Sequence, residues 1–315
     1  MMTTYFGNNN SKIQFSIGPF ADFLIENNSG INKTFSGLDF GFDEERDNTF
    51  GYGIIINTGL SFDFDKNFFK AKNEKKILLT IDDGFSSFYE NAWPFLKKNK
   101  IPFILFVSTE AVGKNGYMTW EELLEVESYD FAFLGNHSHS HDYLIDFTFA
   151  NFKKDIDKSI EIFQKNIGYN PIFFSYPFGE YSQKHVNYIK KSFKYAFGQH
   201  SGVIDLNKNP FELPRFPINE KYGDLKRFSF LINLLPLQYK KVVPQDKYVD
   251  TNNPPALVIE FFPDQKNLDK INCFSDEGNN WEKSQIEIQN QKMLVKFREK
   301  FSFRRGRINC SMNDT

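Results

Sequence analysis

The chain has 315 residues, 40% of them hydrophobic, so it can bury a substantial core in one large domain or in a large and a small one. Its formal net charge of -2 argues against a nucleic-acid binder that depends on a global positive field. No stretch supplies the ~20 consecutive apolar residues of a membrane span, and the N-terminus lacks a signal-peptide pattern. We therefore expect a cytoplasmic protein, or a periplasmic or envelope-associated one if the start is mis-assigned.

Three regions follow one another along the chain. Residues 1–48 are rich in Gly, Asn, Ser and Asp and predict an irregular N-terminal segment. Residues 49–243 alternate short apolar strands with helices, which is typical of βαβ units, and about seven strands favour a distorted (β/α) barrel. Residues 244–315 begin with a proline-containing linker and continue with β-rich runs, which predict a small antiparallel β unit. The sequence leaves open whether Cys273 and Cys310, the only cysteines, pair with each other.

A buried strand in the second region ends in two adjacent carboxylates. The apolar run from Ile77 to Ile81 continues into Asp82, Asp83 and Gly84. Adjacent side chains on a strand point to opposite faces, so the carboxylates converge only if the strand ends here, and Gly84 gives the backbone freedom for such a turn. The carboxyl ends of buried strands are where α/β folds place their chemistry. The alternative is a plain turn before a helix.

Two histidines further along offer partners for these acids. His137 and His141 are spaced i, i+4, which predicts two imidazoles on one side of a helical turn. With one carboxylate they form the ligand set typical of a catalytic zinc that keeps one position open for water. The spacing alone is weak, because histidine clusters also occur on polar loops. His139, between them, is expected to point elsewhere and to form hydrogen bonds within the loop.

Three short motifs follow one another along the chain: Thr80-Ile-Asp-Asp-Gly84, Gly135-Asn-His-Ser-His-Ser-His141 and Tyr176-Pro-Phe-Gly179. In this order they resemble the first three motifs of the NodB-homology polysaccharide deacetylases (carbohydrate esterase family 4), and the similarity extends over about residues 75–219. The resemblance implies a distorted (β/α) barrel and a divalent metal, with zinc expected. It also implies removal of an acetyl group from an N-acetylated amino sugar in a polysaccharide or glycan precursor.

The same resemblance assigns roles to individual residues. Asp83, His137 and His141 are expected to bind the metal. Asp82 is expected to be the general base that takes a proton from the attacking water. The backbone N–H of Phe178 is expected to hold the oxyanion, which requires a loop of fixed shape.

The chain departs from the family pattern in ways that leave alternatives open. Ser175 stands where the third motif usually begins with an arginine that braces the base, and Arg215 could replace that arginine or face solvent. The late Asp-x-x-Asp-Trp motif is missing, and so is the late histidine that usually supplies the general acid. His200 is the remaining candidate for that acid, with a structural loop histidine as the alternative. His185 is expected on the surface of a helix.

These departures also leave two other functions open. One is a carbohydrate-binding barrel that has lost efficient catalysis. The other is a hydrolase of a related C–N amide, such as a sugar deformylase. The sequence names neither the sugar nor the oligomeric state.

Overall fold

The computed structural model describes residues 2–8, 52–63, 67–205, 207–219, 222–249, 251–302 and 304–312. Its largest sheet has seven strands in the order β7-β6-β5-β4-β3-β2-β8. In chain order these are β2 (Tyr52–Asp63), β3 (Asn67–Ile81), β4 (Phe103–Val107), β5 (Ala132–Asn136), β6 (Phe173–Ser175), β7 (Tyr195–Phe197) and β8 (Phe216–Pro217). Residues 9–48 of the predicted irregular segment lie outside the described residues.

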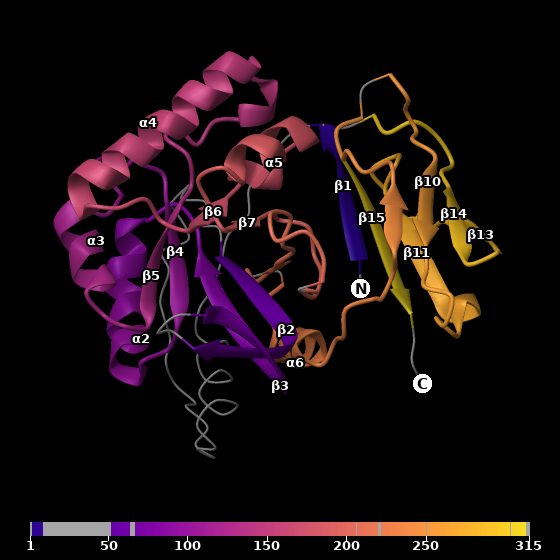
Figure 1. Ribbon diagram of the computed structural model, residues 1–315, viewed down its shortest axis with the longest axis horizontal. Coiled ribbons are helices and arrows are strands. Elements are labelled where there is room, and N and C mark those ends of the chain that lie inside the picture. The colour runs from indigo at the N-terminus through magenta and orange to yellow at the C-terminus, as the bar shows by residue number, and fades with distance from the viewer. Residues whose placement is uncertain are drawn as a thin grey trace.

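The strands from β3 to β7 run parallel and curl into a half-barrel, which confirms the predicted distorted (β/α) barrel (Figure 1). β2 lies antiparallel to β3, and β8 lies antiparallel to β2. Helices cover the outside of the parallel strands, as βαβ connections require. They are a π-helical turn (Phe88–Ala92), α2 (Trp93–Asn99), α3 (Trp120–Glu127), α4 (Phe149–Ile167), α5 (Gln183–Ile189) and α6 (Leu225–Ile232).

Phenylalanine fills much of the barrel core. All residues of β4 are buried, as expected for a central parallel strand covered on both faces. Among the described residues, all but one of the largest fully buried side chains are Phe. Gly135 in β5 makes room for one of them, because a Cβ there would lie 2.4 Å from the ring of Phe106. The parallel strands are therefore held in place by large rings, and their carboxyl ends form one edge.

Capping residues explain where two of the outer helices begin or end. The α3 helix begins with the expected capping box, in which Thr119 and Glu122 bond each other's backbone N–H groups. The α4 helix begins after the N-cap Thr148 and ends at Gly168, whose φ of 84° suits glycine. Its inward face carries Phe152 and other apolar residues, together with the buried polar residues Asp155 and Ser159.

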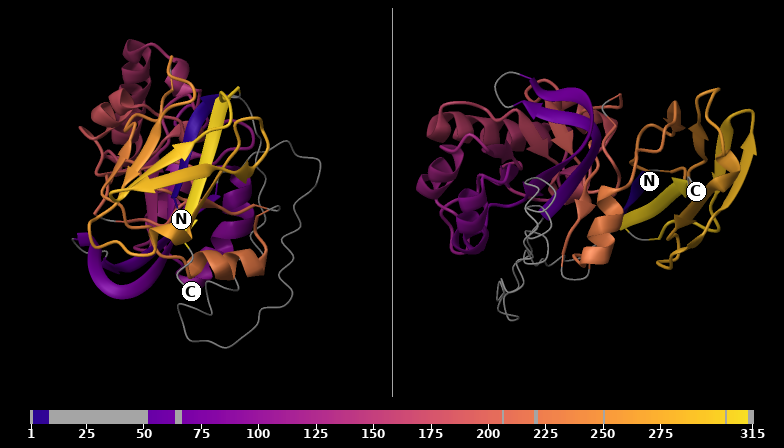
Figure 2. Two further views of the ribbon diagram at one scale, coloured as in Figure 1. Left: turned by 90° about the vertical axis from the view of Figure 1, so that its right-hand side faces the viewer. Right: turned by 90° about the horizontal axis from the view of Figure 1, so that it is seen from below.

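The C-terminal part forms two four-stranded antiparallel sheets (Figure 2). One has the order β1-β15-β11-β12 and the other β13-β14-β10-β9. Their strands are β1 (Met2–Asn8), β9 (Lys241–Val243), β10 (Leu257–Glu260), β11 (Ile271–Ser275), β12 (Glu282–Lys283), β13 (Gln285–Gln289), β14 (Lys292–Lys296) and β15 (Arg304–Met312). Residues 2–8, predicted irregular, thus form a strand beside β15, and β9 begins before the predicted boundary at 244. The domain division itself stays a prediction.

A disulfide closes the first of these sheets. Cys273 in β11 and Cys310 in β15 face each other in the strand register and form a disulfide bond. Both are buried in the apolar cluster between the two sheets, so the bond lies inside this β unit. None of the described helices has the length and apolar character needed to cross a membrane.

Candidate active site

The two adjacent carboxylates lie at the edge formed by the carboxyl ends of the parallel strands. β3 ends at Ile81, and the chain turns at once through Asp83 and Gly84, with φ angles of 77° and 72°. The turn leaves Asp82 buried and 2% exposed, while Asp83 faces the loop after β5. The predicted end of the strand at this point is therefore confirmed.

Asp83, His137 and His141 meet around one point. The Oδ1 atom of Asp83 lies 3.0 Å from Nε2 of His141 and 3.5 Å from Nε2 of His137. One ligand atom from each residue lies within 4.8 Å of the other two, which suits a single ion. The spacing of the two histidines predicted that they share a helical turn, and this prediction was wrong. They lie on an irregular loop in which Ser138 and His141 have φ angles of 70° and 56°.

Two buried atoms of the cluster lack hydrogen-bond partners within the described structure: Oδ1 of Asp83 and Nε2 of His137. Leaving such atoms without partners is costly, and a bound cation would compensate both at once. Two imidazoles and a carboxylate also match the ligand set of a catalytic zinc site. The residues present therefore fit a divalent metal.

The pKa values of the cluster reflect burial and the close charges. Burial raises the pKa of Asp83, but the charges of His141, His137 and Arg215 outweigh it and lower this pKa below its ordinary value. Burial lowers the pKa of His137, which favours the neutral imidazole that a metal needs. Burial also opposes protonation of His141, yet the Asp83 carboxylate raises that pKa above its ordinary value.

Hydrogen bonds from neighbouring strand ends fix His137 and His139 of this loop. Nδ1 of His137 lies 2.7 Å from the carbonyl oxygen of Ser175 at the end of β6, so Nε2 is turned toward the cluster. Ser108, after β4, donates to the carbonyl oxygen of His137. His139 points elsewhere, as predicted, because its Nδ1 lies 2.9 Å from Oγ1 of Thr109.

The α4 helix holds the histidine loop from behind. The carboxylate of Asp155 accepts hydrogen bonds from the backbone N–H groups of His139 and Ser140, at 2.9 and 3.1 Å. Ser159 exchanges hydrogen bonds with the amide of Asn136, whose oxygen accepts from the N–H of Ser138. Sequence reasoning missed Asp155 and Ser159, although both are polar residues on the otherwise apolar face of α4.

Arg215 binds Asp82 through both terminal nitrogens of its guanidinium group. Nη1 lies 2.7 Å from Oδ1 of Asp82, and Nη2 lies 2.8 Å from Oδ2. The same group donates to the hydroxyls of Thr80 and Ser175 and to the carbonyl oxygen of Gly198. Arg215 is 2% exposed, so it does not face solvent. It braces the carboxylate while Ser175, at the position of the missing arginine, supports the brace.

Phe178 lies in a tight turn beside the cluster. Its φ and ψ angles are 58° and 3°, a left-handed conformation that costs a bulky residue roughly 1–3 kcal/mol. Its ring stacks on Tyr143 at 3.9 Å and lies 4.8 Å from the ring of His141. The turn packs closely against the chain behind it, because a Cβ on Gly179 would lie 2.5 Å from the backbone nitrogen of Gln199.

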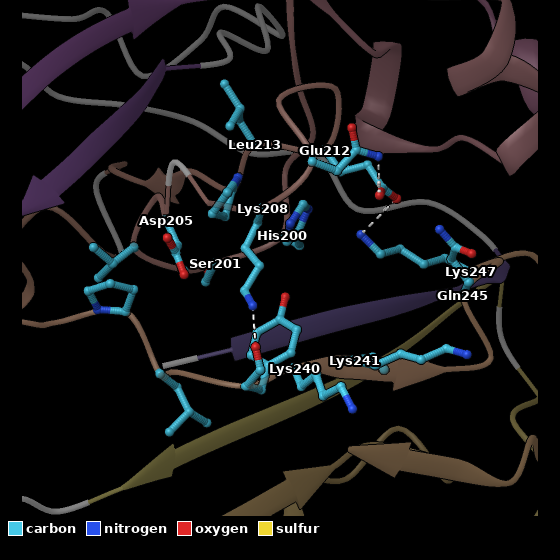
Figure 3. Close-up of a pocket in the computed structure, with 18 of the residues that line it drawn as sticks. His200, Ser201, Asp205, Lys208, Glu212, Leu213, Lys240, Lys241, Gln245 and Lys247 are labelled. Atoms are coloured by element: carbon cyan, nitrogen blue, oxygen red, sulfur yellow. Dashed lines mark hydrogen bonds and ion pairs between the residues drawn. The ribbon is translucent and has the colours of Figure 1, made fainter. Parts of the chain in front are cut away.

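His200 lines a different cavity, of about 290 Å³, formed by residues of 200–214 and 236–247 (Figure 3). None of the residues that line this cavity belongs to the Asp83, His137 and His141 cluster. Burial lowers the pKa of His200 well below its ordinary value, and Lys247 lowers it further. A neutral imidazole lacks the proton that a general acid donates, which argues against that role.

His185 was predicted to lie on the surface of a helix, but it is buried. It is 7% exposed, at the first turn of α5, where its Nδ1 accepts a hydrogen bond from the backbone N–H of Ser182. Its ring also packs edge-on against Phe152 of α4. His185 is therefore part of the packing between two helices and has a structural role.

Comparison with known proteins points to one family. The polysaccharide deacetylase family profile matches residues 69–196. The putative polysaccharide deacetylase YxkH of Bacillus subtilis (strain 168) is 26% identical over 114 residues, which cover 36% of this chain and 40% of that protein. The poly-beta-1,6-N-acetyl-D-glucosamine N-deacetylase of Staphylococcus aureus (strain MSSA476) is 27% identical over 128 residues, covering 36% of this chain and 44% of that protein. The matched segments thus span less than half of these relatives.

Solved structures of similar proteins give more distant matches. A polysaccharide deacetylase from Bacillus cereus is 22% identical with a TM-score of 0.49, covering 56% of this chain and 57% of that one. The Streptococcus pyogenes deacetylase PplD, solved in complex with acetate, is 20% identical with a TM-score of 0.46, covering 49% of this chain and 69% of that one.

Proposed function

We propose that the chain, whose residues 69–196 match the polysaccharide deacetylase family profile, removes the N-acetyl group from an amino sugar of a polysaccharide or glycan precursor. The observation that carries the proposal is the convergence of Asp83, His137 and His141 beside the braced carboxylate of Asp82. The relative that acts on poly-beta-1,6-N-acetyl-D-glucosamine supports an N-acetylated substrate.

Asp83, His137 and His141 would hold a divalent metal, for which zinc fits the two nitrogen ligands and one oxygen ligand best. Such an ion makes water a stronger acid and polarises a carbonyl group. The bond from Nδ1 of His137 to the carbonyl of Ser175 fixes the ring orientation that ligation needs, while burial lowers the pKa of His137 and so favours the neutral ring. His137 is thus oriented for ligation before any ion binds.

Asp82 is proposed as the general base. Both of its oxygens bind Arg215, and Oδ2 also lies 3.9 Å from Nε2 of His137, so the carboxylate borders the cluster. The bidentate bond keeps Asp82 from rotating, and an oriented base accepts a proton without first having to reorganise. The backbone N–H of Phe178 is proposed to donate to the developing oxyanion of the acetyl group.

The Cys273–Cys310 disulfide bears on localisation. Disulfides persist in oxidising compartments and are rare in the cytosol. We therefore favour the periplasmic or envelope-associated location over the cytoplasmic one, which also suits a protein that acts on a surface glycan.

A substrate screen tests the function. The full chain, loaded with zinc, is incubated with N-acetylated glucosamine oligosaccharides and with N-formyl counterparts, and acetate and formate are measured. We expect acetate release that disappears in Asp82→Asn. Formate release alone would favour a deformylase, and binding of the oligosaccharides without any release would favour the carbohydrate-binding barrel.

A further inference from the structure

Strand β15 of the C-terminal β unit inserts an arginine among the loops of the barrel. Arg304, the first residue of β15, is 8% exposed. Its Nε lies 3.1 and 2.9 Å from the two carboxylate oxygens of Glu180, and its Nη2 lies 2.8 Å from Oε2. Its Nη1 lies 2.6 Å from Oδ2 of Asp146. One guanidinium group thus bonds two separate barrel loops.

The same guanidinium group lies over an aromatic ring. The guanidinium carbon Cζ of Arg304 lies 4.0 Å from the centre of the Tyr143 ring. An arginine stacked in this way is attracted to the ring by its charge and also fixes where the ring lies. Tyr143 is therefore held between Arg304 and its stacking partner Phe178, whose ring centre is 3.9 Å away.

This contact chain ends at the proposed reaction centre. Phe178 lies on Tyr143, and its ring centre is 4.8 Å from that of the ligand His141. Arg304 also binds the carboxylate of Glu180, two residues after Phe178. It therefore contacts the turn twice, through Glu180 and through the Tyr143 ring that packs on Phe178. The hydrogen bonds of the turn itself are donated by Gly179 and Glu180, to the carbonyls of Tyr176 and Pro177.

The turn needs such support because its conformation is unfavourable. The left-handed backbone of Phe178 persists only when its surroundings impose it. Breaking one side of a largely buried ion pair leaves the other charge without compensation, so the Arg304–Glu180 pair resists separation. The strand that carries Arg304 is itself fixed between β1 and β11 and joined to β11 by the disulfide.

We propose that Arg304 is a positioning residue of the deacetylase site, through which the C-terminal β unit holds the Phe178 turn in its reactive shape. The proposal rests on the proposed function, since it takes the Phe178 N–H as the oxyanion donor. It gives the β unit a catalytic purpose: a barrel without β15 would keep its metal ligands and lose the geometry of the turn.

The test compares Arg304→Met with Arg304→Lys and with Arg307→Met in the full chain. Arg307 lies on the same strand but pairs with Asp276 inside the β unit, so it controls for loss of a charge from β15. We expect Arg304→Met to lower kcat by about 10- to 100-fold with little change in KM and unchanged zinc content. Arg304→Lys should recover only part, because lysine cannot make the bidentate bond. Arg307→Met should stay within about twofold of the wild type.

Hydrogen–deuterium exchange gives a readout that does not depend on turnover. Exchange of the Gly179 and Glu180 amides should rise in Arg304→Met and stay at the wild-type rate in Arg307→Met. If Arg304→Met does not fold, Glu180→Gln removes the charge from the barrel side and should give the same two effects. Unchanged exchange, or raised exchange with an unchanged kcat, would overturn the proposal. A wild type that is inactive on every substrate would refute the proposed function, and the exchange comparison would still decide whether Arg304 holds the turn.

Discussion

Arg215 and Asp82 form a bidentate ion pair inside the barrel, with both nitrogen–oxygen distances below 3 Å and both residues 2% exposed. The two residues are 133 positions apart in the sequence. Their pairing explains how the chain manages without an arginine at position 175. The serine at that position is uncharged and cannot form an ion pair with Asp82, but its hydroxyl accepts a hydrogen bond from Nη2 of Arg215.

This pairing predicts that an arginine at position 175 can partly replace Arg215 as the partner of Asp82. Arg215→Ala should lower kcat by about 100-fold, because Asp82 loses both of its bonds and becomes a buried carboxylate without compensation. The double variant Arg215→Ala/Ser175→Arg places an arginine where the family usually has it and should recover part of that loss. Steady-state acetate release decides the matter, with zinc content as a control for folding. A double variant slower than Arg215→Ala would show that position 175 cannot supply the brace.

The support from α4 predicts a weaker metal site when Asp155 is changed. Asp155→Ala leaves the N–H groups of His139 and Ser140 without their acceptor, so the histidine loop should lose its fixed shape. We expect zinc affinity to fall by about 10- to 100-fold, the usual effect of losing an outer support of a metal ligand. Competition with a chromophoric chelator measures it. Asp157→Ala, on the same helix but bonded to Tyr188, is the matched control.

The buried His185 predicts loss of stability in mild acid. Burial lowers its pKa to about 4, whereas an unfolded histidine titrates near 6.5. Between these values the unfolded state binds more protons, so the free energy of unfolding should fall as the pH drops from about 6.5 to 4, by at most about 3 kcal/mol. His185→Gln, which stays neutral and suits the third position of the helix, should lose less over this window. Denaturant titrations of metal-free protein at both pH values compare the two, and equal losses would contradict the assignment.

The disulfide predicts a redox-dependent stability. Cys273 and Cys310 are 37 positions apart in the chain, a separation for which a disulfide contributes roughly 2–4 kcal/mol. Reductant should therefore lower the denaturation midpoint of the wild type and leave that of the Cys273→Ser/Cys310→Ser variant unchanged. Mass spectrometry of the unreduced protein checks the bond directly, and two free thiols there would refute it.

The cluster of Asp83, His137 and His141 could be predicted because residue type, position and the resemblance to the deacetylase motifs all pointed to these residues. Asp82 and Asp83 follow one buried strand, and His137 and His141 follow another, so the parallel sheet brings them to one edge. The reason given for the histidines was wrong in detail, because they converge through left-handed loop residues and not through a helical turn.

The supporting residues could not be predicted from local patterns. The sequence left two roles open for Arg215, a brace for Asp82 or a solvent-facing side chain, because nothing near it in the sequence marks a carboxylate partner. Arg304 and Asp155 reach the site from a distant strand and from the inner face of a helix. Pairings of this kind are set by tertiary packing, which spacing along the chain does not encode.

The most direct test measures zinc and acetate together in the wild type, Asp82→Asn and Asp83→Asn. The account predicts one equivalent of zinc and acetate release in the wild type, zinc without acetate release in Asp82→Asn, and neither in Asp83→Asn. An Asp83→Asn protein that binds one equivalent of zinc as tightly as the wild type would contradict it.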